Sequence, residues 1–294
     1  MNKFTKYTYL VAGAIALCGL LCVIVGALGG GFEKAKNIPL NSRFIIFNPT
    51  HTEISEDAEI IGNGEVKEFF AGDIKNLDFA LGACKVDVIP SDNNTVTISN
   101  TTKLDIQSEL DDNTLRIYCD EDTAMLTNPG QVTISIPANM SFDNVDFSFG
   151  AIEYKQSVAM TADSCTIELG AGDMEVESLN ASYIEANVGA GNLTLKKTFT
   201  KNADFEIGMG NLDMDGNITD NMDLDCGMGN ASLILDCMDK DHNVSYDVSM
   251  GTFKYGSTQV DGIAGGNYID NGSDYEYTIA CSMGTIDITF NEKI

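Results

Sequence analysis

Two kinds of side chain recur in the second half of this 294-residue chain at spacings that could serve metal binding. A side-chain oxygen follows the same Gly-x-Gly motif four times, at Asp173, Asn192, Asn211 and Asn230. A thioether occupies the middle of a related motif four times, at Met209, Met228, Met250 and Met283. Serial carboxylates suggest a calcium-binding β-roll, and thioethers near the thiols of Cys226 and Cys281 suggest a soft ion such as Cu(I).

Neither pattern meets the requirements of such a site. The calcium repeat has a nine-residue period with an invariant Asp, whereas here the period is 19 and the residue is mostly Asn. Turn chemistry therefore explains the Asp and Asn better, and we expect the methionines to act as adaptable packing residues.

Catalytic patterns are equally weak. His51 and His242 are the only histidines, and neither has a metal-ligand spacing or a visible Ser or Cys partner for a triad. A solenoid enzyme that cleaves polysaccharides would need a basic residue near acidic clusters, but residues 145–294 contain no Arg and their lysines do not cluster with acids. We expect no catalytic residue, no metal site and no cofactor, so the sequence predicts a protein that is not an enzyme.

The Gly-x-Gly motifs belong to an internal repeat. If the glycine before the second strand marks each copy, the copies fall at Gly150, Gly172, Gly191, Gly210, Gly229, Gly251 and Gly284. The successive spacings are 22, 19, 19, 19, 22 and 33 residues. A nearly fixed period of about 20 residues is typical of a solenoid.

Apolar and polar residues alternate on both sides of each motif, for example at Phe205 and Ile207 before the corner and at Leu212 and Met214 after it. Alternation of this kind predicts strands with one buried face. Each unit is therefore a strand, a glycine corner, a second strand and a polar turn, and the units stack about 4.8 Å apart. We expect one internal ladder in this order: Leu169, Val188, Ile207, Cys226, Val248 and Cys281.

Glycine at the corners has two explanations. It permits a positive φ, and it avoids a collision between a side chain and the next coil.

The chain begins with a candidate membrane segment. Tyr9–Leu28 is a 20-residue uncharged apolar run that follows Lys3 and Lys6, which predicts a transmembrane helix with residues 1–8 in the cytoplasm. The alternative is a signal peptide cleaved near Ala27. A lipoprotein signal is disfavoured because leucine directly precedes both Cys18 and Cys22. Both main alternatives export everything after Phe32.

Residues 29–69 are predicted as a juxtamembrane linker that runs into a first strand, and residues 70–294 as one extracellular all-β solenoid domain. An early coil turns at Gly82, and residues 104–117 form a hairpin or a coil turn around Asp112. Residues 256–274 are an insertion in the last coil. The final strand, Ile286–Phe290, would leave an open end, so we expect either a cap from the insertion or end-to-end self-association.

The exported part is strongly acidic. Residues 33–294 hold all 44 acidic residues and 15 of the 17 basic ones, a net charge near −29 (15 − 44). Such a surface would repel nucleic acid and anionic lipid. We expect the outward Asp and Glu to keep the sheet soluble. The alternative is a diffuse surface for cations or cationic ligands.

The eight cysteines divide into two groups. Cys18 and Cys22 lie in the apolar run, and five others occupy predicted inward positions, where Cys acts as a small hydrophobic residue: Cys84, Cys165, Cys226, Cys237 and Cys281. With Val248 between them, Cys226 and Cys281 would lie about 9.6 Å apart, too far for a disulfide. We expect buried free thiols, and a disulfide between Cys84 and Cys119 is the alternative.

Three features together resemble a known family: the strand Val132–Pro137, the segment Phe142–Phe149 and the serial Gly-x-Gly-Asp/Asn corners. They are similar to the bacterial "putative adhesin" β-strand-repeat family of envelope proteins. The resemblance covers about residues 70–290 and implies a single-chain β-solenoid on the outer face of a bacterial membrane. It implies no catalytic residues, and the family name does not establish adhesion.

The sequence thus predicts a membrane-anchored extracytoplasmic β-solenoid that acts as a non-catalytic interaction, adhesion or structural module at the cell surface. The expected partners are a surface protein or a cell-wall polymer, together with the membrane through residues 9–28, and not nucleic acid. The alternative is an envelope-stress sensing domain that acts through a membrane partner, since eight cytoplasmic residues are too few for a signalling domain. A glycan-processing enzyme is a third, disfavoured hypothesis.

Overall fold

The computed structural model describes residues 58–82, 84–119, 130–262 and 266–291, all of which belong to one unit, residues 47–294. These residues confirm the predicted all-β class, because they form 21 strands in one hydrogen-bonded sheet and a single 3-10 helix, η2 (Ala71–Asp73). The predicted membrane segment, residues 9–28, lies outside the described residues. Within the described ranges, no helix has the length and apolarity to cross a bilayer.

Strands β1 to β11 have these bounds: β1 (Glu59–Ile61), β2 (Glu65–Phe70), β3 (Asn76–Leu81), β4 (Lys85–Ser91), β5 (Thr95–Asn100), β6 (Ile106–Asp111), β7 (Thr114–Tyr118), β8 (Val132–Pro137), β9 (Ser141–Gln156), β10 (Met160–Val176) and β11 (Leu179–Val188). Strands β12 to β21 follow: β12 (Asn192–Ile207), β13 (Asn211–Ile218), β14 (Met222–Cys226), β15 (Asn230–Leu235), β16 (Asn243–Val248), β17 (Thr252–Tyr255), β18 (Thr258–Asp261), β19 (Asn267–Ile269), β20 (Glu276–Cys281) and β21 (Thr285–Phe290). Strand β1 and all but the last residue of β2 lie within residues 29–69, where the sequence suggests a linker running into a strand.

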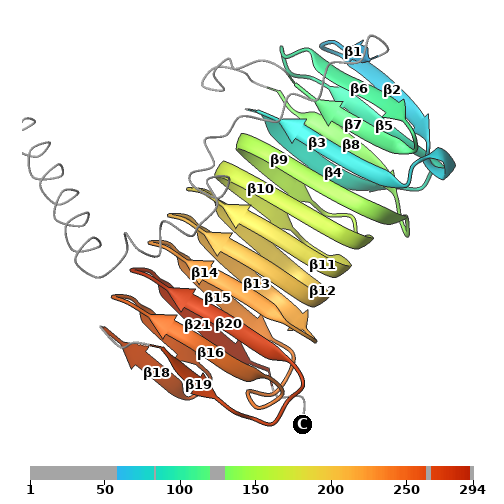
Figure 1. The fold of residues 1–294 in the computed structure, drawn as a ribbon. Coiled ribbons are helices and arrows are strands. Elements are labelled where there is room, and N and C mark those ends of the chain that lie inside the picture. The colour runs from blue at the N-terminus through green and yellow to red at the C-terminus, as the bar shows by residue number, and fades with distance from the viewer. Residues whose placement is uncertain (1–57, 83, 120–129, 263–265, 292–294) are drawn as a thin grey trace, which may run out of the picture. The chain divides into compact units, whose positions relative to one another are not determined.

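The middle of the fold is a stack of parallel coils (Figure 1). From β10 to β15 most residues of a coil pair with the residue 19 positions later in the next, as Asn192 does with Asn211 and Asn211 with Asn230. A register shift after Leu195 reduces the spacing to 18 for residues 198–200. In β12 a coil consists of three paired segments, residues 192–195, 198–200 and 203–207. The repeat period read from the sequence is therefore the length of one solenoid-like coil.

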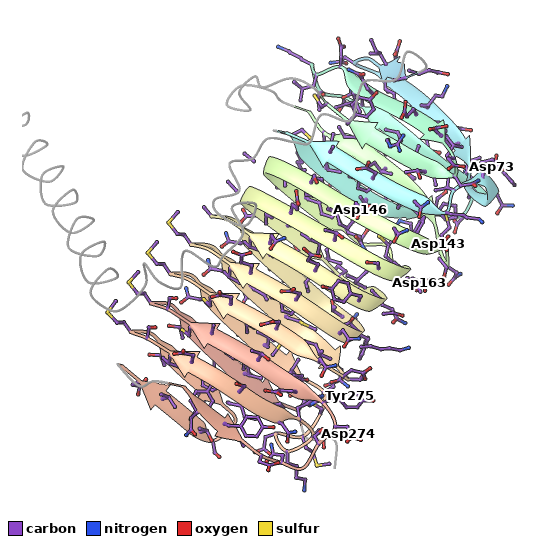
Figure 2. All side chains as sticks on the ribbon, in the orientation of Figure 1. Asp73, Asp143, Asp146, Asp163, Asp274 and Tyr275 are labelled. Carbon is purple, nitrogen blue, oxygen red and sulfur yellow. The ribbon has the colours of Figure 1, made fainter. Side chains whose placement is uncertain are left out.

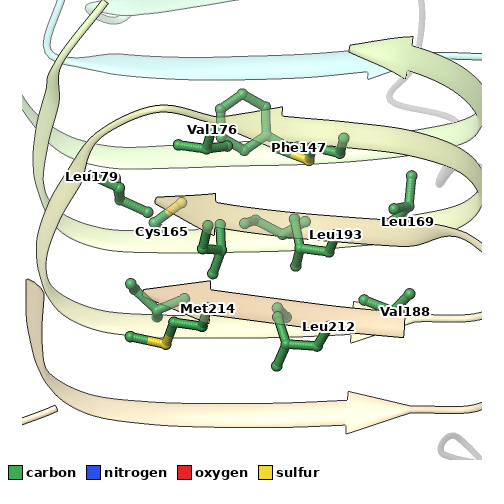
Figure 3. Packing of buried hydrophobic residues seen from close by; sticks show 14 of the residues in the cluster. Phe147, Cys165, Leu169, Val176, Leu179, Val188, Leu193, Leu212 and Met214 are labelled. Carbon is green, nitrogen blue, oxygen red and sulfur yellow. The ribbon is translucent and has the colours of Figure 1, made fainter. Parts of the chain in front are cut away.

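Inward side chains stack into apolar ladders, as the alternating pattern predicts. Figure 3 shows Leu169 and Val188 in one ladder and Leu193, Leu212 and Met214 on the segment across the core. Leu169, Leu193 and Leu212 have no exposed surface. Because each apolar side chain packs against its equivalents above and below, the core continues from coil to coil.

The corner glycines are required by close backbone approach. A Cβ added at Gly210 would lie 2.2 Å from the carbonyl oxygen of Gly191, and one at Gly229 would lie 2.1 Å from that of Gly210. Neither glycine has a positive φ. Of the two explanations for glycine, collision with the next coil is the one that applies at these positions.

The order of coils at the C-terminal end differs from the order along the chain. Strands β20 and β21 pair with β14 and β15 on one side and with β16 and β17 on the other. The final strand is therefore internal, and the expected ladder order was wrong, since Cys281 lies between Cys226 and Val248. Apolar alternation assigns a strand to a face but does not choose its neighbour.

The insertion forms the end of the stack. Strands β18 and β19 pair antiparallel with β17 and β16. Both are short, with four and three residues, which limits the length of unpaired backbone at the edge. The insertion thus forms a cap, as one of the two alternatives predicted, but it covers β16 and β17 and not the final strand, which is internal.

The N-terminal end has a similar arrangement. Strands β3 and β4 pair with β9 on one side and with β7 and β8 on the other. Strands β5 and β6 then pair antiparallel with β8 and β7, followed by β2 and β1. The segment around Asp112 is confirmed as a hairpin, because β6 and β7 are antiparallel and Asp112 and Asn113 have φ values of 45° and 63°.

The corner collision predicts a large cost for one added methyl group. We expect Gly229→Ala to destabilise the protein by about 2–3 kcal/mol, because the new Cβ must displace the backbone of the neighbouring coil. Gly266→Ala is the matched control, since its Cβ would meet only the Tyr246 carbonyl oxygen at 3.4 Å, and its effect should stay within about 0.5 kcal/mol. Thermal unfolding measures both variants, and equal melting temperatures would contradict the corner geometry.

Candidate functional site

In-register stacking converts the recurring Asp and Asn into a continuous hydrogen-bonded row. The Asn192 amide donates to Asp173 Oδ1 at 2.6 Å, Asn211 donates to Asn192 at 2.6 Å, and Asn230 donates to Asn211 at 2.9 Å. These bonds run between coils and not to local backbone, so the expected turn chemistry is replaced by an amide ladder. The Asn192 and Asn211 side-chain oxygens accept from the next asparagine of the row. No group of three or more His, Cys, Asp and Glu in the described part is placed to hold a metal ion.

The segment before each corner presents rows of carboxylates to solvent. One row passes through Glu185, Asp204 and Asp223 in register. Two residues further along the same strands, Glu206 and Asp225 pair in register and form a second row. These five residues are termed the carboxylate face. They come from β11, β12 and β14, so only the stacking brings them together.

Partial burial and mutual repulsion both act on this face. Partial burial, then Asp223, then Glu185 raise the pKa of Asp204 above its ordinary value. Partial burial followed by Asp225 and Asp204 raises the pKa of Glu206, and partial burial followed by Asp223 raises the pKa of Asp225. Each carboxylate therefore favours its charged form less than it would in water.

The segment after the corner has a different charge arrangement. Lys85 pairs with Glu153 at 2.9 Å, Lys254 pairs with Asp287 at 3.1 Å, and Lys196 pairs with Glu175 and Glu177. The pKa of Glu175 is lowered, chiefly by its hydrogen bond from Lys196. The ion pairs found among the described residues do not include any member of the carboxylate face.

The corner methionines are exposed and not packed, contrary to the expectation from sequence. Their exposed fractions are 63% for Met209, 55% for Met228, 40% for Met283 and 49% for Met250. Figure 2 shows sulfur-bearing side chains following one another along an edge of the stack.

Five cysteines of the described part carry free thiols, as predicted: Cys84, Cys165, Cys226, Cys237 and Cys281. Cys84, Cys165, Cys226 and Cys281 are buried, and Cys237 is partly buried. Burial raises the pKa of Cys84 and of Cys237 to about 12, and that of Cys226 to about 11. At neutral pH these thiols are protonated and therefore poor nucleophiles.

The expected distance between Cys226 and Cys281 was wrong. The two residues pair directly in register on β14 and β20, because the last coil is inserted ahead of β16. Each thiol donates to a corner carbonyl, Cys226 to Gly229 at 3.2 Å and Cys281 to Gly284 at 3.3 Å.

His242 is a buried structural residue. Its ring stacks on Tyr277 at 4.0 Å, and Nε2 lies 3.1 Å from the carbonyl oxygen of Thr219. A carbonyl only accepts, so Nε2 carries the proton, and the buried Nδ1 has no partner among the described residues. Desolvation lowers the pKa of His242 despite the raising effects of the Thr219 hydrogen bond, Asp241 and Asp220. His51 lies outside the described residues.

A polar pocket of about 400 Å³ opens at the N-terminal end of the stack. Its lining consists of Glu59, Lys67, Phe69, Ser108, Glu109, Leu110 and Asp111. Lys67 pairs with Glu59, so the charges at the mouth are already partly matched. The buried Ser108 hydroxyl has no hydrogen-bond partner among the described residues. No sequence motif indicates this pocket, because its walls come from β1, β2 and β6.

The fold and its outward rows define the class of protein: an all-β repeat protein with solenoid-like stacking. Residues 74–235 match the family model described as Toastrack DUF4097, and the chain belongs to this family. The predicted resemblance to "putative adhesin" repeat proteins is thereby confirmed.

Two solved structures are among those to which the chain is similar. A "putative adhesin" from Parabacteroides distasonis has 17% identity and a TM-score of 0.45, covering 77% of this chain and 97% of that chain. A "putative adhesin" from Bacteroides fragilis has 12% identity and a TM-score of 0.43, covering 80% and 98%. These values are too low to transfer a function. No curated protein matches the chain.

Repulsion on the carboxylate face predicts that removing one charge stabilises the protein. The raised folded-state pKa of Asp204 means that its charged form costs stability above that pKa, and this cost vanishes as the pH falls below the ordinary value of 3.8. We expect Asp204→Asn to raise the melting temperature at pH 7, by less than about 1 kcal/mol in stability because solvent screens the group.

Asp213→Asn is the matched control, because Asp213 lies between the uncharged residues Thr194 and Ser232. Thermal melts at pH 7 and near pH 3.5 separate the effect of removing a charge from the effect of changing the side chain. A gain for Asp204→Asn that persists at the acidic pH would contradict an electrostatic origin.

His242 predicts a stability loss in mild acid. Its folded-state pKa lies below the ordinary value of 6.5, so below that pH the unfolded chain takes up a proton more readily than the folded one. We expect the parent protein to lose stability relative to His242→Gln as the pH falls from 7.5 to 5. The Gln amide can still donate to Thr219 but does not titrate. Parallel pH dependences of the two melting temperatures would show that His242 does not cause the loss of stability in acid.

Proposed function

We propose that this protein is a non-catalytic module of the bacterial cell surface, held by residues 9–28 in the membrane, that binds a partner along its carboxylate face. The observation that supports the proposal is the charge arrangement of the stack. Glu185, Asp204 and Asp223 repeat the same charge on consecutive coils, and the ion pairs found in the described part of the chain do not include them. Repeat proteins commonly bind through such extended surfaces, because each coil contributes an equivalent group.

The contrast between the two segments supports binding over solubility alone. The segment after the corner carries comparable acids but neutralises several with Lys196 and Lys254. The carboxylate face instead tolerates partial burial and, after it, repulsion between like charges, which together raise the pKa of Asp204, Glu206 and Asp225. Scattered acids of either segment would serve solubility, whereas a row of unpaired acids offers a partner a linear array of acceptors.

The chemistry of the face indicates a partner that bears cationic groups at its surface. Lys or Arg side chains of a surface protein, or amino groups of a cell-wall polymer, would form charge-assisted hydrogen bonds with successive coils. Such contacts also accelerate association between oppositely charged surfaces. Export of the repeat domain follows from the uncharged apolar run Tyr9–Leu28 and the lysines that precede it.

Neutralisation of defined residues tests the proposal. The full chain is crosslinked in its native membrane, captured and analysed by mass spectrometry, in parallel with two double variants. Asp204→Asn/Asp223→Asn removes two charges from the carboxylate face. Asp213→Asn/Asp215→Asn removes two exposed charges from the other side of the corner. We expect the first variant to lose at least tenfold of the captured partner and the second to retain it.

Equal capture by both double variants would contradict the proposed face. Specific capture of a membrane-embedded kinase, transporter or regulator would favour the sensing function instead.

A further inference from the structure

We propose that the exposed corner methionines form a binding site for a soft monovalent metal ion, Cu(I) or its analogue Ag(I). The site consists of Met209, Met228, Met283 and Met250, in the order of the stack, and is termed the thioether row. Its sulfur ligands are not part of the carboxylate face, although Glu206 and Asp225 of that face lie nearby, and the proposal does not depend on the proposed function.

Backbone hydrogen bonds place the four residues on consecutive coils. The Met228 amide donates to Gly208 at 2.8 Å, that of Met283 to Gly227 at 2.7 Å, and that of Met250 to Ser282 at 2.7 Å. Met209 makes the equivalent bond to Gly189 at 2.7 Å. The row is therefore unbroken, with Cα atoms about one coil spacing, 4.8 Å, apart. Insertion of the last coil between β14 and β16 makes Met283 a central member.

The fold does not require methionine at this corner. Ala190 occupies the same position one coil earlier, and its amide makes the same bond, to Gly170 at 2.8 Å. The corner thus accepts a methyl group, and the larger side chain projects into solvent. Four apolar side chains between 40% and 63% exposed on an acidic protein are a cost to solubility that packing does not offset.

The chemistry of the row suits a soft cation. Thioether sulfur is neutral and polarisable, and it favours Cu(I) over hard ions such as Mg²⁺ or Ca²⁺. A carboxylate precedes three of the four methionines by three residues, at Glu206, Asp225 and Asp247. These groups give the corner a negative potential that attracts a cation without supplying a hard-ligand cage.

The geometry allows several sulfurs to meet one ion. Each Met side chain has three rotatable bonds and adapts its shape readily. Glycine or serine flanks every methionine of the row, as Gly227 and Gly229 flank Met228, so no bulky neighbour blocks the thioether. Met228 and Met283 have a neighbour on each side and should contribute most to binding, whereas Met209 and Met250 end the row.

Competition with a chromophoric Cu(I) chelator tests the site. The full chain, in detergent and under anaerobic conditions with ascorbate, is titrated against bicinchoninate-bound Cu(I). We expect the parent to remove Cu(I) from the chelator. The quadruple Met→Leu variant of the row should bind it at least tenfold more weakly, because leucine keeps the apolar bulk but lacks sulfur. Met283→Leu should weaken binding more than Met209→Leu.

Two further measurements exclude trivial outcomes. A quadruple Met→Ala variant repeats the Ala190 corner and should keep the parent's melting temperature, so loss of binding would not reflect unfolding. All eight cysteines remain in every variant, which makes the parent-to-leucine difference specific for thioethers. With methyl-labelled methionine, Ag(I) should shift the resonances of the row and leave most of the 12 methionines unmoved. Identical chelator competition by parent and leucine variant, or unshifted methyl resonances, would overturn the proposal.

Discussion

Backbone hydrogen bonding between consecutive coils in strict register is the interaction on which the rest of this structure depends. Residues 19 positions apart meet because each strand donates to and accepts from its neighbour along its whole length. The same bonds force the corner backbones so close that Gly210 and Gly229 have no room for a Cβ. Inner and outer surfaces follow directly from this register: apolar side chains form ladders inside, while amides, carboxylates and thioethers form rows outside.

The sequence predicted this central stack well because its signals are local and repeated. Period-2 alternation assigned inward residues such as Leu193 and Leu212, which are fully buried. The Gly-x-Gly spacing identified the coil length. The two ends were less accessible, since strands β3 and β20 have the same alternation as any coil strand. Their insertion between earlier and later coils depends on long-range strand pairing, and the residue pattern does not specify which strands pair. This is why Cys281 was placed one coil too far from Cys226.

The outward rows were only partly predictable. Recurrent Asn after each corner was visible in the sequence, but its inter-coil amide bonds depend on the distance between coils. The carboxylate face had no motif at all, because its rows mix Glu with Asp and their members, such as Glu185, Asp204 and Asp223, are 19 residues apart. Exposure of the methionines contradicted the usual behaviour of an apolar residue. In each case the residue identity was known, and the missing information was which side of a coil it occupies and what lies above and below it.

The carboxylate face retains like charges that the fold could neutralise. A parallel stack repeats every outward charge at the coil spacing, so uncompensated like charges accumulate unless lysine intervenes. The chain places lysine in this way beside Glu175 and Asp287, which shows that the fold accommodates neutralisation. It does not do so beside Asp204, whose pKa is raised by partial burial and then by two carboxylates in register. A repulsive row is stabilised when an oppositely charged surface binds it, because binding removes the repulsion and adds charge-assisted hydrogen bonds. A partner of opposite charge would therefore gain more free energy on this face than on the already neutralised segment after the corner.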